Sequence, residues 1–216
     1  MRKTVDSIKN QTFRDFEVWI IDGNSSNETQ EYLSKLEAPF FYQSKTDKGI
    51  YDAMNKGISL SKGEWFYFLG AGDLLENESI LTLVSNKLNL NLDILYGNIR
   101  YDAIKFTSIF SSFLWIKNTL HHQSVFYNKK LFSEINYEIS YNVLADYDFN
   151  LNLYCKNINA EKMDAIISNC DKEGISKDYN WSLYREELKL KSARTNLVFH
   201  PLFFLLVAFK FIFRKL

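Results

Sequence analysis

The chain lacks the features that would place it in several common classes of protein. Only two of its 216 residues are cysteines, Cys155 and Cys170, and neither stands in a metal-type spacing with histidines, which argues against a zinc site. So low a cysteine content fits a reduced, cytosolic setting. The 26 basic and 26 acidic residues cancel, so we expect no general nucleic-acid-binding surface.

Targeting segments and long hydrophobic runs are also scarce. Met1 is followed at once by Arg2, Lys3 and a polar helical pattern, which is not the pattern of a signal peptide, so we expect a cytoplasmic protein. The uncharged run over residues 201–209 is too short to cross a bilayer, which takes about 20 apolar residues. No internal repeat or low-complexity linker divides the chain.

The C-terminal segment, residues 196–216, is apolar and carries basic residues near its end, namely Lys210, Arg214 and Lys215. This combination favours a helix that lies in the membrane interface, at the cytoplasmic face of the inner membrane. The alternative is a helix docked against the protein's own core or against a partner subunit. We therefore expect one domain over residues 1–195, followed by this segment.

Strands and helices alternate along the first half of the chain. The expected strands cover residues 16–21, 40–43, 64–69 and 93–97, and the expected helices end near residues 10, 33, 60 and 89. This spacing predicts βαβ units and an α/β fold with a mainly parallel central sheet. Farther on the pattern loosens, with a strand expected over 124–127 and helices over 146–154 and 182–194.

The most informative stretch is the apolar run over residues 65–69, which stops at a Gly-Ala-Gly turn and is followed by Asp73. Such a run predicts a strand buried on both faces, as in a parallel sheet. The glycines, Gly72 among them, permit a sharp turn and leave room for a ligand. Asp73 then stands where open α/β sheets meet a metal or a phosphate. The alternative is a turn residue that caps a helix from Leu74 onward.

Three other short polar segments stand next to the expected strands and helices. Asp22 comes directly after a strand, where its carboxylate can accept hydrogen bonds from a base or a ribose, or can cap the next helix. In the segment over residues 46–57, Lys48 is suited to meet a phosphate and Gly49 permits close backbone approach. The last of these segments is the acidic one over residues 145–148. Each signal is weak alone, because aspartate is common in loops and caps everywhere.

The order of these polar segments along the chain resembles that in family 2 glycosyltransferases of the GT-A fold, particularly in bacterial enzymes of the colanic-acid type. The resemblance runs through most of the chain, and no single element of it would suffice. The matching segments are residues 4–12, 16–26, 47–57, 70–73, 122–124, 145–148 and 173–176. The fold implied is the three-layer GT-A sandwich. The activity implied is transfer of a sugar from a nucleoside diphosphate sugar, with UDP-sugars expected first, to an acceptor hydroxyl.

The resemblance also implies roles for single residues. Asp73 would ligate Mg²⁺ or Mn²⁺ across the diphosphate. Asp146 would be the base that takes the acceptor's proton in an inverting displacement, with Asp148 as a rival that points elsewhere if the segment is helical. The residues implied at the nucleotide sugar are Asp22, Asp47, Lys48, Asn55 and Gly72. Those implied at the acceptor or diphosphate are His122 and Gln123.

His121 and His122 also admit a plainer reading, as loop histidines that hydrogen-bond to backbone. Two departures from the family weigh on the expected activity. The family's first strand, which supplies part of the base pocket, is absent before the first helix, so the domain is expected to be N-terminally truncated. Either the true start lies upstream, or the chain is a truncated and inactive version. The metal motif keeps one carboxylate, so diphosphate and water would supply other ligands.

The leading expectation is a membrane-associated enzyme of bacterial surface polysaccharide synthesis, with a lipid-linked or saccharide acceptor. The alternatives are a truncated, inactive paralogue that acts as an interaction subunit, and a nucleotidyltransferase. A nucleotidyltransferase would need a Gly-rich, basic phosphate loop near the N-terminus, and none is seen.

Overall fold

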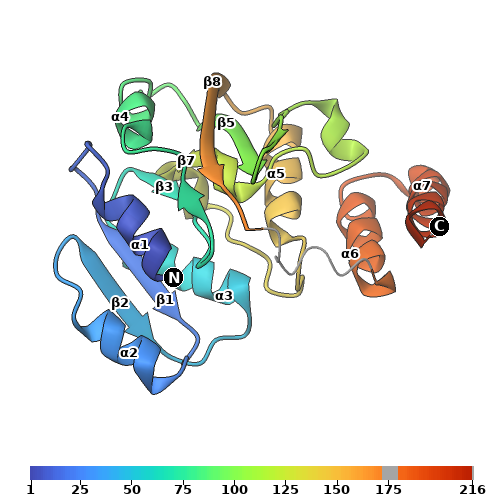
Figure 1. Cartoon of the computed structure of the whole chain (residues 1–216). Helices are drawn as coiled ribbons and strands as arrows, with labels where there is room; N and C mark the ends of the chain where they lie inside the picture. The colour runs from blue at the N-terminus through green and yellow to red at the C-terminus, as the bar shows by residue number, and fades with distance from the viewer. Residues whose placement is uncertain (172–179, 216) are drawn as a thin grey trace.

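The computed structural model describes residues 1–171 and 180–215 (Figure 1). The helices are α1 (Arg2–Lys9), α2 (Asn27–Ser34), α3 (Ile50–Leu60), α4 (Ile80–Ser85), α5 (Ala145–Cys155), α6 (Trp181–Ser192) and α7 (His200–Lys215). The strands are β1 (Val18–Asp22), β2 (Phe40–Ser44), β3 (Trp65–Tyr67), β4 (Leu74–Leu75), β5 (Ile94–Tyr101), β6 (Ile104–Phe106), β7 (Val125–Asn128) and β8 (Ala160–Asn169). Short 3-10 helices include η1 (Ser112–Trp115) and η2 (His122–Ser124). The expected segment 173–176 lies outside the described residues.

The strands form two sheets. β1 and β2 pair in parallel beside α1 and α2, toward one end of the molecule (Figure 1). The second sheet has the order β3-β7-β5-β8-β4, with β6 added to β5. Among its described pairs, β5 and β8 run parallel and the others run antiparallel. The α/β fold is therefore as expected, but the prediction of a mainly parallel sheet is wrong, because the sheet is mixed.

The reason lies in the connections after β5. Parallel neighbours need a long crossover, usually a helix, whereas the chain turns back from β5 into β6 and reaches β7 through 3-10 segments. The apolar run over residues 65–69, which was expected to be buried on both faces, also differs from the prediction. β3 pairs antiparallel with β7, its sole partner in the described sheet, and only its central Phe66 is buried. The expectation of a missing first strand stays a prediction.

Helix α5 carries the acidic segment into the core beside the six-stranded sheet. Eight of its eleven residues are buried, including both Asp146 and Asp148. Aromatic side chains pack around it, and the rings of Phe132 and Phe149 stack with centroids 4.9 Å apart. A carboxylate buried in such surroundings is costly unless it is paired or hydrogen-bonded, so the partners of these two aspartates indicate what each does.

The C-terminal helices lie side by side at the opposite end of the molecule from β1 and β2 (Figure 1). The inner face of α7 packs on the protein, because the ring of Phe211 lies 5.0 Å from that of Trp181 and the ring of Phe203 stacks on Trp115 at 5.8 Å. Within the part of the chain that the structure describes, no helix combines the length and apolar character needed to cross a bilayer. The division of the chain at residues 195 and 196 stays a prediction.

Candidate active site

Two neighbouring residues of η2 join the two carboxylates expected to carry the chemistry. His122 Nδ1 lies 3.0 Å from Asp146 Oδ2, and Gln123 Nε2 donates to Asp73 Oδ2 at 3.1 Å. Asp73 comes from the loop after β3 and Asp146 from the first turn of α5, 73 positions later in the sequence. The structure thus brings four of the expected site residues into one connected group.

Asp73 is buried, and hydrogen bonds from two loops reach its carboxylate. Oδ2 accepts from Gly70 N at 3.1 Å and Oδ1 accepts from Asp171 N at 2.8 Å, so the side chain ties the loop after β3 to the end of β8. The alternative of a cap for a helix from Leu74 is wrong, because Leu74 begins β4 and the next helix starts at Ile80.

A second carboxylate stands beside this loop. A Cβ atom on Gly72 would lie 2.8 Å from Oδ2 of Asp171, so the glycine leaves the space in which that carboxylate sits. Sequence reasoning missed Asp171 because β8, which delivers it, has few apolar residues in its first half. Among the described residues no cluster of three His, Cys, Asp or Glu side chains could hold a metal. Two carboxylates nonetheless fit Mg²⁺ or Mn²⁺, which prefer oxygen donors and accept phosphate and water as further ligands.

The buried carboxylate of Asp146 is surrounded by hydrogen-bond donors. Oδ1 accepts from Tyr147 N at 2.8 Å and from the Tyr51 hydroxyl at 3.2 Å, while His122 occupies Oδ2. Burial raises the pKa of Asp146, but the hydrogen bond from His122, the charges of His122 and His121 and the Tyr147 N–H outweigh it, so the pKa is lowered. The carboxylate is therefore ionised at neutral pH. Tyr51, from α3, is a site residue that sequence reasoning did not single out.

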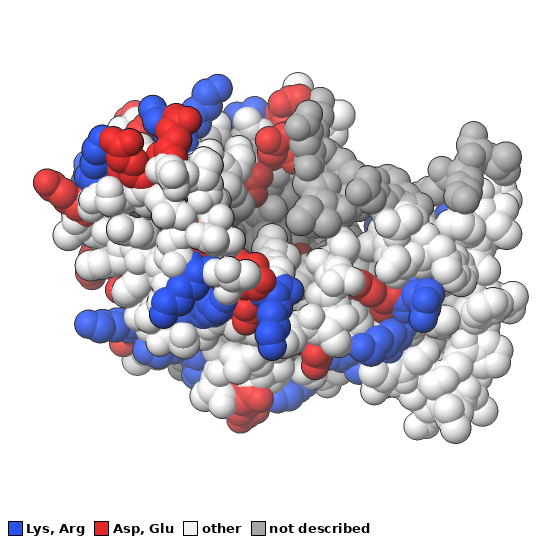
Figure 2. Space-filling model, turned by 90° about the horizontal axis from the view of Figure 1, so that it is seen from below, with Lys and Arg blue, Asp and Glu red and all other residues white. Residues whose placement is uncertain are grey.

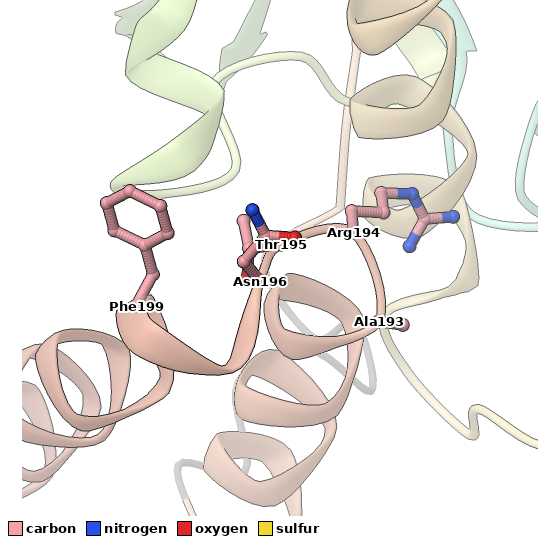
Figure 3. Close-up of a pocket in the computed structure, with 5 residues that line it drawn as sticks. All are labelled: Ala193, Arg194, Thr195, Asn196 and Phe199. Atoms are coloured by element: carbon pink, nitrogen blue, oxygen red, sulfur yellow. The ribbon is translucent and has the colours of Figure 1, made fainter.

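Asp148 forms an ion pair with Arg194. Both terminal nitrogens of the Arg194 guanidinium donate to its carboxylate, Nη2 to Oδ2 at 2.7 Å and Nη1 to Oδ1. Figure 3 shows the Arg194 side chain extending from the end of α6 toward α5, beside a surface pocket lined by Ala193, Thr195, Asn196 and Phe199. This pocket contains none of the expected site residues. Asp148 therefore joins α5 to α6, and its role is separate from that of Asp146.

Like the two aspartates, His121 and His122 have different surroundings. His121 is packed against aromatic rings, with its ring centroid 4.6 Å from that of Phe106 and 6.5 Å from that of Tyr101. Burial lowers the pKa of His121, opposed by the charge of Asp146 and reinforced by that of His122. His121 is thus neutral at pH 7 and belongs to the core, whereas His122 belongs to the connected group.

A second group lies where β1 ends. Asp22 is buried and accepts from Ser44 Oγ at 2.6 Å and Ser25 N at 3.1 Å. Burial raises the pKa of Asp22, but these hydrogen bonds outweigh it, so the pKa is lowered. The carboxylate of Asp47 sits against Gly23, where a Cβ would meet it at 2.8 Å. The two acidic residues expected at the nucleotide therefore belong to adjoining loops.

The segment that follows Asp47 reaches from this second group to the first. Asp47 Oδ1 accepts from Gly49 N at 3.0 Å, and Gly49 adopts a φ of +119°, which only glycine tolerates well, immediately before α3. Tyr51 in the first turn of α3 then contacts Asp146. Lys48 is exposed on the same loop. The loop and helix thus hold the two acidic groups in a fixed relation.

Asn55 is set apart from both groups. Its amide forms two hydrogen bonds with the backbone of Tyr137, donating to the carbonyl oxygen at 2.8 Å and accepting from the N–H at 3.0 Å. The side chain therefore clamps α3 to the segment before α5.

Comparison with known proteins shows the family and the fold of the chain. The sequence model of the family described as "Glycosyl transferase family 2" matches residues 1–148. A "PGL/p-HBAD biosynthesis glycosyltransferase" of Mycobacterium tuberculosis (strain ATCC 25177 / H37Ra) is 36% identical over 161 residues, which cover 69% of this chain and 62% of the relative. The chain therefore spans less than two thirds of that relative.

Solved structures share the fold at low sequence identity. TarS of S. aureus in complex with UDP-GlcNAc has a TM-score of 0.70 at 16% identity, covering 89% of this chain and 61% of that one. The mannosyltransferase PcManGT from Pyrobaculum calidifontis, in complex with GDP-Man and Mn²⁺, has a TM-score of 0.66 at 13% identity, covering 94% and 63%. The expected GT-A fold is confirmed.

Proposed function

The chain belongs to glycosyl transferase family 2, and from that premise we propose that it moves a sugar from a nucleoside diphosphate sugar to an acceptor hydroxyl with inversion at the anomeric carbon. The observation that carries this proposal is the pair His122 and Gln123, which connects Asp146 to Asp73. A single displacement needs a group that takes the acceptor's proton and, on the opposite side of the sugar, groups that stabilise the leaving diphosphate. One connected set of side chains supplies both ends.

The diphosphate end is assigned to Asp73, Gly72 and Asp171. The chemistry that a bound Mg²⁺ or Mn²⁺ supplies is neutralisation of the charge that develops on the leaving diphosphate. Asp73 and Asp171 offer oxygen donors for such an ion, and Gly72 leaves the room in which the carboxylate of Asp171 sits. Gln123 holds Asp73 in place. The Mn²⁺ in the complex of PcManGT with GDP-Man supports this assignment.

The donor's nucleotide is assigned to the loops around Asp22 and Asp47, with Lys48 available to a phosphate. An ionised Asp22 accepts hydrogen bonds from a base N–H or from ribose hydroxyls. TarS was solved with UDP and with UDP-GlcNAc, which supports a UDP-sugar as the first donor to test, and PcManGT with GDP-Man makes a guanosine donor the second. Asn55 acts through the position of α3 rather than by touching the donor.

The acceptor is proposed to be a lipid-linked or saccharide hydroxyl at the cytoplasmic face of the inner membrane, in the assembly of a bacterial surface polysaccharide. The outward face of α7 supports the membrane contact. Its exposed apolar side chains are Leu202, Phe204, Leu205, Phe209, Ile212 and Phe213. Lys210, whose side chain the structure describes, instead turns inward to Glu187. Figure 2 shows that the edge of the molecule where α7 lies is almost entirely uncharged. The outward face that these apolar side chains form favours contact with an apolar medium.

The proposal is tested by thermal unfolding of the purified chain with a panel of nucleotide sugars, in Mn²⁺, in Mg²⁺ and in EDTA. A ligand that binds the folded state alone raises the melting temperature, by an amount that grows with its concentration over its Kd. We expect a UDP-sugar to raise it only with metal, and Asp73→Asn to lose this effect. Asp164→Asn, at a fully exposed site, is the matched control. If no nucleotide or nucleotide sugar shifts the transition, the proposed donor site is wrong.

A further inference from the structure

We propose that Glu186 of α6 is a positioning residue for Asp146, and that it acts by binding the backbone of the turn from which α5 begins. The inference rests on the proposed function, in which Asp146 takes the acceptor's proton. Glu186 lies beyond residues 1–148, over which the family's sequence model matches. The hydrogen bonds of its carboxylate connect this later part of the chain to the base.

The carboxylate of Glu186 accepts hydrogen bonds from three consecutive backbone N–H groups. Oε1 accepts from Asn142 N at 2.7 Å, and Oε2 accepts from Val143 N and Leu144 N, each at 3.1 Å. Successive N–H groups that converge on one anion form a nest, in which the backbone is held at several points. The carboxylate therefore fixes the path of residues 142–144 rather than a single atom of it.

Helix α5 needs a partner at its start because its own N-cap residue offers none. The N-cap is Leu144, whose side chain carries no hydrogen-bond acceptor. A carboxylate is also favoured at this end of a helix by the helix dipole. Glu186 of α6 thus takes the place that serine, threonine, asparagine or aspartate commonly fills at a helix start.

The same turn is held from α3 as well. The Tyr51 hydroxyl donates to the carbonyl oxygen of Val143, and it also lies 3.2 Å from Asp146 Oδ1. Val143 is therefore bound at its N–H by α6 and at its carbonyl by α3. Backbone groups bound by two helices leave the first turn of α5 little freedom to shift.

The position of this turn decides where the Asp146 carboxylate lies. Asp146 is in the first turn of α5, and its short side chain has few rotatable bonds, so the carboxylate moves with the backbone. A base must come within about 2.6–3.2 Å of the proton that it accepts. A displacement of about 1 Å can cost about 100-fold in rate. Fixing residues 142–144 therefore fixes the base.

Burial gives Glu186 a cost that these hydrogen bonds offset. The residue is 9% exposed, and a carboxylate is costly to bury unless its oxygens are hydrogen-bonded. A second contact joins the same two helices, since Arg194 of α6 donates to Asp148, which is also in the first turn of α5. Helix α6 thus holds the start of α5 at two points.

The neighbouring Glu187 is a matched control. It is 8% exposed and lies on the same helix, but it pairs with Lys191 and with Lys210 of α7. Glutamine at either position keeps the size of the side chain and removes the carboxylate. In Glu186→Gln, however, the amide NH₂ replaces one of the accepting oxygens and so turns a donor toward a backbone N–H.

The first experiment measures release of the nucleoside diphosphate from a nucleotide sugar in Mn²⁺, with UDP-GlcNAc as the first probe and with water and added monosaccharides as acceptors. We expect Glu186→Gln to lower kcat about 10–100-fold, with KM for the donor and the donor-induced rise in melting temperature unchanged. Glu187→Gln should lower the melting temperature but keep the kcat of wild type. A general loss of stability would not produce this split between kcat and KM.

The second experiment does not depend on turnover. Amide hydrogen exchange of the whole chain should be faster at residues 142–144 in Glu186→Gln than in wild type, because the hydrogen bonds that protect these amides are weakened. Glu187→Gln should leave exchange in this segment unchanged.

Three results would overturn the positioning role. Wild-type kcat in Glu186→Gln would mean that the turn keeps its place without the carboxylate. An equal loss of kcat in Glu187→Gln would mean that any loosening of α6 suffices, and a raised KM with unchanged kcat in Glu186→Gln would assign the residue to donor binding. If wild type binds the donor but releases no diphosphate, the proposed function itself fails, whereas turnover by wild type with Glu186→Gln unaffected refutes the positioning role alone.

Discussion

Replacing Gly72 by alanine would push a Cβ atom into the carboxylate of Asp171. The nearest atoms would be Oδ2 at 2.8 Å, Cβ at 3.2 Å and Cγ at 3.4 Å, all in the same side chain. Oδ2 is the far end of a rotatable group, so the clash is relieved by turning the carboxylate aside rather than by moving the sheet. We therefore expect the free energy of unfolding to change by less than about 1 kcal/mol.

The effect on metal-dependent donor binding should be much larger. Moving a ligand or its support out of place typically costs about 10–100-fold in metal affinity. Gly72→Ala should thus require about 10–100-fold more Mn²⁺ to produce the same donor-induced rise in melting temperature. Asp171→Asn should do the same, because an amide oxygen is a weaker ligand than a carboxylate.

The matched control is Gly57→Ala. A Cβ at this position in α3 would meet only Ile21 Cγ1, at an ordinary 3.6 Å. Because alanine is favoured over glycine inside a helix, this variant should be more stable by about 0.5–1 kcal/mol and keep its response to Mn²⁺. An unchanged Mn²⁺ response in Gly72→Ala, with Asp171→Asn equally unaffected, would refute the assignment of Asp171 to the ion.

Two further outcomes can be measured. Arg194→Met should lower the free energy of unfolding by about 3 kcal/mol in denaturant titrations, because it leaves the buried Asp148 carboxylate without the Arg194 guanidinium. A loss below about 1 kcal/mol would mean that water solvates the ion pair. Leu205→Ser with Phe209→Ser should weaken binding to anionic vesicles without loss of stability, because both side chains point outward from α7. Leu90→Ser, at an exposed apolar side chain outside α7, is the control, and equal vesicle binding by all variants would exclude a membrane role for α7.

Elements with a clear local pattern were predictable from sequence. The helix expected to end near residue 60 is α3 (Ile50–Leu60), and that expected over 146–154 is α5 (Ala145–Cys155). In α3 the buried Tyr51 and Met54 are three residues apart and mark one face, whereas α5 is buried along most of its length. β8 was not predicted, because its buried Met163 and Ile167 are separated by polar and half-buried residues that hide the alternation. Its place in the sheet, between β5 and β4, depends on strands that lie far away in the chain.

The sequence by itself named the residue types of the site: aspartates at 22, 73 and 146 after strands and at a helix start, and the His-Gln pair. It left Asp148 as a rival of Asp146, and it left open whether His122 serves the site or is, like His121, a loop histidine; the tertiary structure separated the members of each pair. Arg194 on α6 takes Asp148, and the aromatic rings around His121 leave the ring of His122 to Asp146. The physical reason is that a side chain's chemistry depends on its burial and partners, and these come from segments that the local sequence does not specify.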